Sequence, residues 1–322
     1  MPQTADAAQP FEVEIIETTE IAEAIRELRL RPVEGALPSF SAGAHLKFCI
    51  ANGQWNAYSL ITLPQDDDTG SYRIAIRRDE AGAGGSIFMH GLKPGDRISA
   101  EPPRNDFALH EGTAPSLLIA GGIGLTPLIS MATRLAAEGR DFRLIQAARN
   151  RAAAAYHDQL VTAFGDRVTL HLDDQEGGPL PLAPLLGRIS ADTHVYVCGP
   201  RPMIDATRAA FTARGLPEAQ FHTELFETSQ AAKGDQPFEV EIADGRVFTI
   251  PAGKTIIEVL EENDIDLVYD CQRGDCGICQ TDVLEGTPDH RDVVLSEAER
   301  SSGEVMQICV SRALSARLKL DL

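Results

Sequence analysis

The sequence predicts a multidomain protein: an antiparallel β-barrel, then an α/β module built on a parallel sheet, then a small module that contains most of the cysteines. Three observations predict this order. Short β-runs separated by turn residues fill the first hundred positions, which is typical of barrels. From Pro115 onward, apolar strands alternate with glycine turns and helices, as in a parallel sheet with crossover helices. Four of the six cysteines lie in the last quarter of the chain.

Bulk properties exclude several classes of function. The chain has 322 residues, 43% of them hydrophobic, which is enough for two or three domains with cores of their own. Its net charge of -19 argues against binding nucleic acid or an anionic membrane surface, because both require basic patches. No apolar run reaches membrane-spanning length, and the first residues lack the basic-then-apolar pattern of a signal peptide. We therefore expect a cytoplasmic protein.

The barrel strands are expected in FEVEII, HLKFCI, QWNAYSLI, YRIAIRR and KPGDRISAEPP. Tyr58 on the third of these can lay its ring against a flavin isoalloxazine, and the Ser59 hydroxyl can reach the reactive edge of that ring. A core tyrosine is the alternative. The segment Gly84-Gly85-Ser86 favours the flavin, since it offers a helix start where backbone amides can bind a phosphate.

In the α/β module, strands are expected in SLLIA, FRLIQAA, RVTLHL and HVYVC, with helices in LTPLISMATRLAAEG, at 152–163 and after GPRP. Residues 121–124, Gly-Gly-Ile-Gly, follow the first strand, and Thr126-Pro127 begins a helix, so bare amides lie at a positive helix end that suits a pyrophosphate. This turn is not the full dinucleotide fingerprint and can be purely topological.

Cys198-Gly199-Pro200 occupies the equivalent end of a later strand in the same sheet, where ligands bind in doubly wound folds. This position favours a nucleotide site with the thiol against a nicotinamide. A small buried side chain that ends a strand is the alternative.

The C-terminal module begins after a small, polar stretch, residues 229–236, which is typical of a linker. A hairpin is expected from FEVEI, ADG and RVFTI. Thr255 and Glu258 fit a capping box that opens a helix reaching about Asn263.

The six cysteines are too few and too unevenly spaced for a secreted disulfide framework. Cys271, Cys276 and Cys279, with a distant Cys309, have the spacing by which plant-type ferredoxins hold a [2Fe-2S] cluster. Gly274 and Gly277 let the backbone wrap tightly round such a cluster. The alternatives are structural zinc, which more usually takes two short-spaced cysteine pairs, and buried cysteines without chemistry. Cys49 lies in an apolar strand pattern and is expected in the core.

A nicotinamide delivers two electrons as hydride, whereas a [2Fe-2S] cluster accepts one electron at a time. A cofactor that converts between the two is therefore needed, and flavin is the usual one. This gives a reason to expect flavin that is independent of the Tyr58 motif.

Eight segments in one order, between about residue 11 and the C-terminal LKLDL, resemble the phthalate dioxygenase reductase family, which includes vanillate demethylase reductases. They are NAYSL, GAGGSI, PPRNDFAL, AGGIGLTPLISM, VYVCGPRPM, CQRGDCGIC, DHRDVVL and ICVSRA. The resemblance implies an FMN-binding β-barrel domain at 1–110, an NADH-binding α/β domain at 111–228, the linker at 229–236 and a [2Fe-2S] ferredoxin domain of β-grasp form at 237–322.

The resemblance also implies the roles of individual residues. For the flavin they are Tyr58, Ser59, Ala75, Arg77, Gly84, Gly85, Ser86 and the stacking Phe226. For NADH they are Gly122, Gly124, Thr126, Pro127, Cys198, Gly199 and Pro200, with Asp173 at the adenosine ribose. Cys271, Cys276, Cys279 and Cys309 would ligate the irons.

One position departs from the family pattern, which usually has arginine two places before the tyrosine of the flavin motif. This chain has Asn56 there. One positive side chain that would contact the FMN phosphate is therefore missing, and we expect weaker FMN retention unless Arg77 compensates.

The expected function is that of an NADH-dependent reductase that passes electrons from FMN to the cluster and then to a Rieske-type oxygenase. Cys198, Ser59 and Glu224 are expected to position and polarise the reactants, and the cluster edge near Arg273 and Asp275 to be partly exposed. A general flavin or ferredoxin reductase and a redox-sensing binding protein remain alternatives. We expect a monomer.

Overall fold

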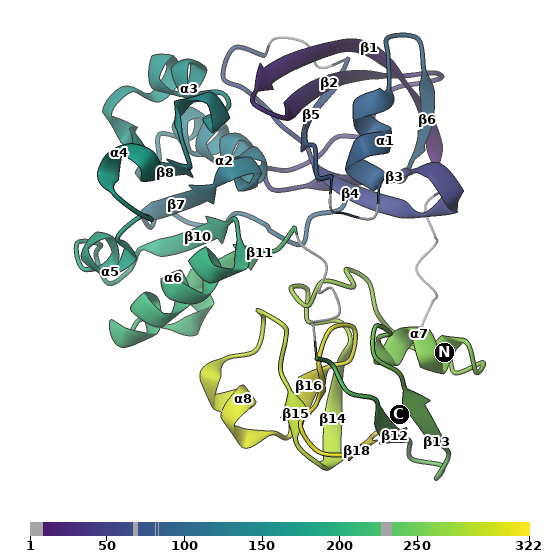
Figure 1. The fold of residues 1–322 in the computed structure, drawn as a ribbon. Coiled ribbons are helices and arrows are strands. Elements are labelled where there is room, and N and C mark those ends of the chain that lie inside the picture. The colour runs from purple at the N-terminus through teal and green to yellow at the C-terminus, as the bar shows by residue number, and fades with distance from the viewer. Residues whose placement is uncertain (1–8, 67–69, 81, 83, 227–233) are drawn as a thin grey trace. The chain divides into compact units, whose positions relative to one another are not determined.

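The computed structural model describes residues 9–66, 70–80, 82, 84–226 and 234–322. The chain divides into two compact units, Met1–His222 and Thr223–Leu322, and the division falls within strand β11 (Figure 1). Most of the predicted linker, at 229–233, lies outside the described residues. Within the described part of the chain, no helix is both long and apolar enough to cross a membrane.

The first half of the N-terminal unit is an antiparallel six-stranded sheet with the order β4-β3-β6-β1-β2-β5. Its edges meet, because the Ile61 amide just after β4 donates to the Arg73 carbonyl on β5 at 2.9 Å, as the predicted barrel requires. Val13, Leu28, Phe48 and other apolar side chains fill the core. The elements are β1 (Phe11–Ala22), β2 (Ile25–Pro32), β3 (His45–Cys49), β4 (Trp55–Ser59), β5 (Tyr72–Arg77), α1 (Gly85–Gly91) and β6 (Arg97–Ala100), with a 3-10 turn at Ala51–Gly53.

The second half of this unit is a five-stranded sheet with the order β11-β10-β7-β8-β9, in which β10, β7, β8 and β9 are parallel. Its strands are β7 (Ser116–Gly121), β8 (Phe142–Ala148), β9 (Val168–Leu172), β10 (His194–Cys198) and β11 (Phe221–Glu224). Its helices are α2 (Leu125–Ala137), α3 (His157–Phe164), α4 (Asp173–Glu176), α5 (Leu182–Leu186) and α6 (Arg201–Ala213), with 3-10 turns at Gly122–Gly124, Arg151–Ala153, Gly165–Arg167 and Glu218–Gln220.

Helix α3 begins at His157 instead of at the predicted residue 152. The Asn150 side chain accepts a hydrogen bond from the Ala153 amide and so caps a separate 3-10 turn at Arg151–Ala153. Tyr156 then has a φ of 58°, a left-handed conformation that a right-handed helix excludes. The predicted helix is therefore wrong over its first residues and right from His157 onward.

The C-terminal unit has a mixed sheet with the order β13-β12-β18-β14-β16. Its first and last strands, β12 and β18, are parallel neighbours, and α7 packs Ile256 and Leu260 into the core, as a β-grasp fold requires. The predicted capping box of Thr255 and Glu258 is present. The elements are β12 (Phe238–Glu241), β13 (Val247–Ile250), α7 (Ile256–Glu261), β14 (Gln280–Glu285), β15 (Pro288–Asp289), α8 (Glu297–Ser302), β16 (Val305–Gln307), β17 (Arg312–Ala313) and β18 (Arg317–Leu320).

Candidate functional site

Two side chains of the predicted flavin motif lie at the end of β4. Tyr58 is half-buried, and burial raises its pKa, while a hydrogen bond with the Asn56 side chain lowers it in part. The Ser59 hydroxyl oxygen is buried and has no hydrogen-bond partner among the described residues. Leaving a buried hydroxyl unpaired costs about 1 to 3 kcal/mol. Ser59 therefore fits a site that is completed by a polar group of a bound ligand, as a flavin would provide.

The predicted phosphate contacts lie at the start of α1. Gly84 precedes this helix with a φ of 90°, which favours glycine. A Cβ atom on Gly85 would lie 2.1 Å from the side-chain nitrogen of Asn56, so glycine allows the start of α1 to touch this side chain. The Ser86 hydroxyl accepts a hydrogen bond from the Asp79 amide at 3.0 Å, which ties α1 to the residues after β5.

The remaining barrel residues of the prediction lie on β5. Ala75 is buried in the middle of this strand, and Arg77 is exposed at its last position. Because β5 packs against both β4 and α1, the structure brings the predicted flavin residues of the barrel to one region.

The predicted nucleotide segments lie at the switch point of the parallel sheet. The chain runs from β7 to β8 and β9 on one side, and then returns to β10 on the other side of β7. Ligands of doubly wound sheets bind outside the carboxyl ends of the two strands that flank such a point. Gly121 ends β7 and residues 122–124 follow it, while residues 199–200 follow β10, so the structure brings both segments together there.

The two turns touch backbone to backbone. A Cβ atom on Gly124 would lie 2.2 Å from the Cys198 carbonyl oxygen, and one on Gly199 would lie 2.9 Å from the Gly121 Cα atom. The close packing of the two turns is thus enough to explain why Gly124 and Gly199 carry no side chain. Gly122 differs, because it is exposed, has a φ of 55° and has open space around its Cα atom. Its exposed backbone suits a phosphate contact.

The other predicted nucleotide residues have different surroundings. Thr126 and Pro127 are buried in the first turn of α2, and the Thr126 hydroxyl donates to the Ile123 carbonyl at 3.1 Å. Cys198 is completely buried. Asp173 follows β9, two strands away from β7, and its carboxylate lies 3.4 Å from the His171 ring. Only the extended adenosine end of a dinucleotide could reach Asp173 from the switch point.

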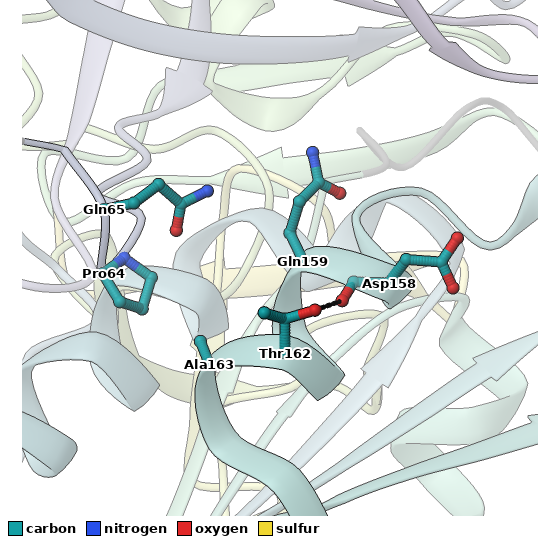
Figure 2. A pocket seen from close by; sticks show the side chains of 6 residues that line it. All are labelled: Pro64, Gln65, Asp158, Gln159, Thr162 and Ala163. Atoms are coloured by element: carbon teal, nitrogen blue, oxygen red, sulfur yellow. Dashed lines mark hydrogen bonds between the residues drawn. The ribbon is translucent and has the colours of Figure 1, made fainter.

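A shallow groove of about 510 Å³ lies elsewhere in this unit, between the loop after β4 and helix α3 (Figure 2). Pro64 and Gln65 form one side, and α3 forms the other with Asp158, Gln159, Thr162 and Ala163. None of these residues is a predicted site residue.

The four predicted iron ligands lie in contact within the C-terminal unit. Cys271 lies within hydrogen-bonding reach of the thiols of Cys276 and Cys309, and Cys309 within reach of Cys279. These contacts lower the pKa of Cys271 and Cys279 and raise that of Cys276 and Cys309, because the sulfurs share protons. Four sulfurs in one contiguous set fit a [2Fe-2S] cluster, in which each iron takes two of them.

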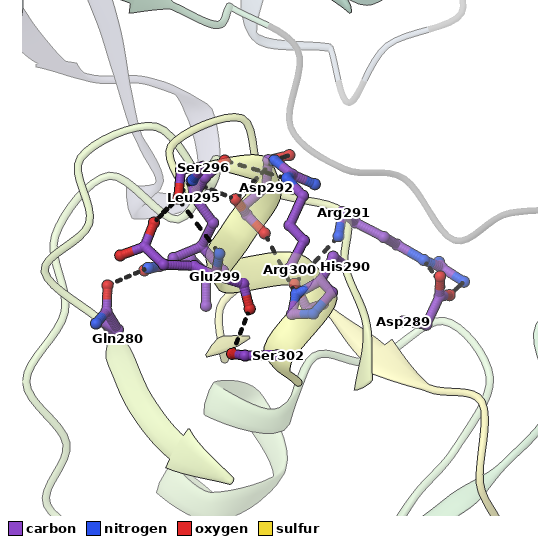
Figure 3. Close-up of polar contacts among 12 residues, drawn as sticks. Gln280, Asp289, His290, Arg291, Asp292, Leu295, Ser296, Glu299, Arg300 and Ser302 are labelled. Carbon is purple, nitrogen blue, oxygen red and sulfur yellow. Dashed lines mark hydrogen bonds and ion pairs between the residues drawn. The ribbon is translucent and has the colours of Figure 1, made fainter. Parts of the chain in front are cut away.

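Polar contacts connect the residues of the segment 289–302 (Figure 3). This segment contacts the cysteine loop, because the Val293 amide donates to the Gly274 carbonyl at 2.8 Å. The fully buried Asp292 carboxylate accepts hydrogen bonds from the Leu295 amide at 2.9 Å and the Arg300 guanidinium at 3.0 Å. Gly274 has a φ of 80°, and its Cβ atom would lie 2.9 Å from the Asp292 Cα atom. Sequence reasoning missed Asp292 and also Gln307, whose side-chain amide oxygen accepts a hydrogen bond from the Cys279 thiol at 3.4 Å. The segment DHRDVVL was the available signal for Asp292.

The side chains of Arg273 and Asp275 are themselves largely buried, 11% and 5% exposed. The expected partial exposure concerned the cluster edge near them, and it stays a prediction. The Arg273 guanidinium lies 3.5 Å from Asp275 and 3.9 Å from Glu224, and Asp275 also accepts from the Leu225 amide at 2.9 Å. Burial raises the pKa of Asp275 to about 7. These ionic contacts explain why the residues turn inward.

The exposed side chains of the cysteine loop are Gln272 and Ile278, the latter 45% exposed. Glu224 belongs to the buried group around Arg273, and Phe226, two residues on, is half-buried. Ile278 directly precedes Cys279, so the cysteine loop reaches the surface at a position that sequence reasoning did not select.

Comparisons with known proteins agree with this geometry. The family model described as a 2Fe-2S iron-sulfur cluster binding domain matches residues 240–314. Phenoxybenzoate dioxygenase subunit beta of Ectopseudomonas oleovorans is 40% identical over 293 residues, which cover 90% of each chain. Vanillate O-demethylase oxidoreductase of Pseudomonas putida is 37% identical and covers 96% of this chain and 98% of its own.

The solved structure of phthalate dioxygenase reductase, described as a modular structure for electron transfer from pyridine nucleotides to [2Fe-2S], covers 97% of this chain and 98% of its own. Its TM-score is 0.72 at 36% identity. These findings confirm the predicted fold class, the predicted cofactors (a flavin, NADH and a [2Fe-2S] cluster) and the predicted electron-transfer reductase activity. The chain belongs to the phthalate dioxygenase reductase family of flavin- and iron-sulfur-containing oxygenase reductases.

Proposed function

We propose that this protein is the reductase component of a Rieske-type oxygenase system. It takes hydride from NADH and passes single electrons by way of FMN and the [2Fe-2S] cluster to the oxygenase. The observation that carries the proposal is the contiguous set of four thiols in the unit that matches the 2Fe-2S family. Bound flavin would convert two-electron delivery into the single electrons that such a cluster accepts.

The protein's own groups bind and orient the reactants. The buried Ser59 hydroxyl would hydrogen-bond the edge of the flavin, and Tyr58 would pack against its ring. The Gly122 amide and the start of α2 would hold the pyrophosphate of the nucleotide. Cys198 would lie beside the nicotinamide, and Glu224 and Phe226 would help to position the flavin. None of these side chains needs to act as a strong acid or base.

We also propose the identity of the flavin, the kind of oxygenase, the oligomeric state and the domain bounds. The flavin is FMN, whose phosphate would meet Arg77 and residues 84–86. The relatives' names, a dioxygenase subunit and an O-demethylase oxidoreductase, support an oxygenase that hydroxylates an aromatic ring or demethylates its substrate. The protein acts as a cytoplasmic monomer that meets this partner transiently and binds neither nucleic acid nor membrane. Its domains span 1–110, 111–228 and 237–322.

The decisive measurement is the visible spectrum of protein purified without air, before and after one equivalent of NADH, with iron, sulfide and flavin assayed on the same sample. We expect overlapping flavin and cluster bands that both bleach. Zinc without sulfide, or bands that NADH leaves unchanged, would refute the relay. If the protein is a general reductase, it should reduce unrelated electron carriers as fast as it reduces a Rieske-type oxygenase. If it is a redox sensor, it should show no steady NADH turnover with artificial acceptors.

A further inference from the structure

A pair of hydroxyl groups on α2 holds the chain that leaves the flavin strand β4. The Ser130 hydroxyl donates to the Leu60 carbonyl at 2.8 Å and accepts from the Thr62 amide at 2.9 Å. The Thr133 hydroxyl, one position along the same helix face, donates to the Thr62 carbonyl at 2.8 Å. Three hydrogen bonds therefore join residues 60–62 to α2.

The opposite edge of residues 60–62 is held by the barrel. The Leu60 amide donates to the Ala44 carbonyl at 2.8 Å, and the Ile61 amide donates to the Arg73 carbonyl at 2.9 Å. Residues 60 and 61 thus donate hydrogen bonds to the barrel, whereas the Leu60 carbonyl and both backbone groups of Thr62 bond to α2. Ser130 is 2% exposed, so water cannot replace its bonds if the hydroxyl is removed.

The two ends of this connection lead to the two cofactor sites. Ser59, whose buried hydroxyl has no partner within the described part of the chain, is joined by its peptide bond to Leu60. Thr126, at the start of α2 beside the switch-point turns, lies one helical turn, about 6 Å, before Ser130. One side chain therefore links the strand that would hold the flavin edge to the helix that would hold the nucleotide.

We infer that Ser130 is a positioning residue that sets the nicotinamide against the flavin for hydride transfer. This inference rests on the proposed function. Ser130 touches neither reactant and acts through the backbone of residues 60–62 and through α2. Hydride transfer requires the reacting atoms to lie about 3 to 3.5 Å apart, and a displacement of 1 Å can cost about 100-fold in rate. A hydroxyl that locks the two supports together is placed to prevent such a displacement.

The test is Ser130→Ala in the full-length protein with flavin and cluster bound. We expect flavin and iron content to stay unchanged and the single-turnover rate of hydride transfer from NADH to fall about 10- to 100-fold. The KM for NADH should change less than kcat. The Thr62 amide should exchange its hydrogen faster with deuterated water, a readout that does not depend on activity. Thr162→Ala, which removes an exposed hydroxyl bonded within α3, is the matched control.

Thr133→Ala keeps the test decisive if Ser130→Ala does not fold. Thr133 is only half-buried, so its loss should be tolerated, and we expect a smaller fall in hydride transfer with faster exchange in residues 60–62. Unchanged hydride transfer in a folded Ser130→Ala, or in Thr133→Ala where Ser130→Ala is unfolded, would overturn the inference. If the wild-type protein itself fails to bleach with NADH, the proposed function fails instead, so the two failures are distinguishable.

Discussion

Glycines at the nucleotide turns are required for packing whether or not a ligand is bound. Because a side chain on Gly124 would meet the Cys198 carbonyl at 2.2 Å, Gly124→Ala must push the two turns apart. We expect NADH to bleach the flavin at least 10-fold more slowly, since a displacement of this size is costly for hydride transfer. Stopped-flow absorbance measures this. Gly91→Ala, which meets nothing within 4 Å, is the control, and equal rates in the two variants would contradict the assignment of the switch point.

Asn56 lies at the position where the resemblance to the family leads one to expect arginine. Its side chain bonds to Tyr58 and lies against Gly85 at the start of α1, so it occupies the edge of the proposed phosphate site. Asn56→Arg should add one charge-assisted contact, worth about 1.5 to 3 kcal/mol, and tighten FMN binding about 10- to 100-fold. Titration of the apoprotein with FMN measures the dissociation constant. An unchanged or weaker affinity would show that Asn56 does not face the phosphate.

At this scale the spacing of the cysteines selected four residues that the structure brings together. Three of them lie on one loop, where a cluster imposes its geometry on neighbouring positions, and their role as iron ligands stays a prediction. The burial of Arg273 and Asp275 could not be predicted, since it depends on Glu224 and on the Leu225 amide, which lie about 50 residues earlier in the chain.

Among the elements, β10 and β11 carry His194 and His222, which form a stack with His110 from the segment before β7. His110 and His194 stack with ring centroids 3.7 Å apart, and a ring nitrogen of His194 lies 2.9 Å from one of His222. The Arg140 guanidinium contacts His110 at 2.8 Å. Burial, together with neighbouring positive groups, lowers the pKa of all three histidines, to about 4 for His110 and His222.

These shifts predict how stability depends on pH. A histidine whose pKa is lower in the folded state binds its proton more readily in the unfolded state, so the native state is fully favoured above about pH 6.5 and loses stability as pH falls toward 4. Urea unfolding at pH 7.5 and pH 5 measures the loss. His222→Phe keeps a ring against Tyr196 and should flatten the dependence between those values. An equally steep loss in that variant would contradict the role of the stack.

The strands that the sequence analysis did not predict are those whose formation depends on contacts with distant parts of the chain. β2 has the sequence IRELRLRP, whose charges hide its apolar alternation. Glu27 in this strand is 7% exposed because Tyr156 donates to its carboxylate at 2.6 Å and Arg73 lies 3.2 Å away. The strands after Cys279 are short and carry polar residues, and β12 and β18, about 80 residues apart, become neighbours only in the fold.

At the scale of the molecule, the barrel and the ferredoxin-like unit have separate hydrophobic cores. Cys309→Ser removes an iron ligand from the C-terminal unit and should abolish the cluster. NADH should still bleach the flavin at the wild-type rate, because Ser59 and the switch point belong to the other unit. Electron delivery to a one-electron acceptor protein should fall to background. Iron analysis and stopped-flow spectra measure both effects.

Cys49→Ser is the matched control, since Cys49 lies in a barrel strand away from the other cysteines in the sequence. We expect it to keep iron, flavin and electron delivery. A Cys309→Ser variant that retained its cluster, or that lost its flavin reduction, would contradict the division of labour between the two units.

The strand that carries Tyr58 and Ser59 begins with Trp55, which is 37% exposed and is the one tryptophan of the chain. The molecule therefore contains an optical reporter at the flavin motif. Its emission overlaps flavin absorption, so energy transfer would dim it when FMN is bound and restore it when FMN leaves. Flavin exchange can then be followed by ultraviolet excitation of the unlabelled protein.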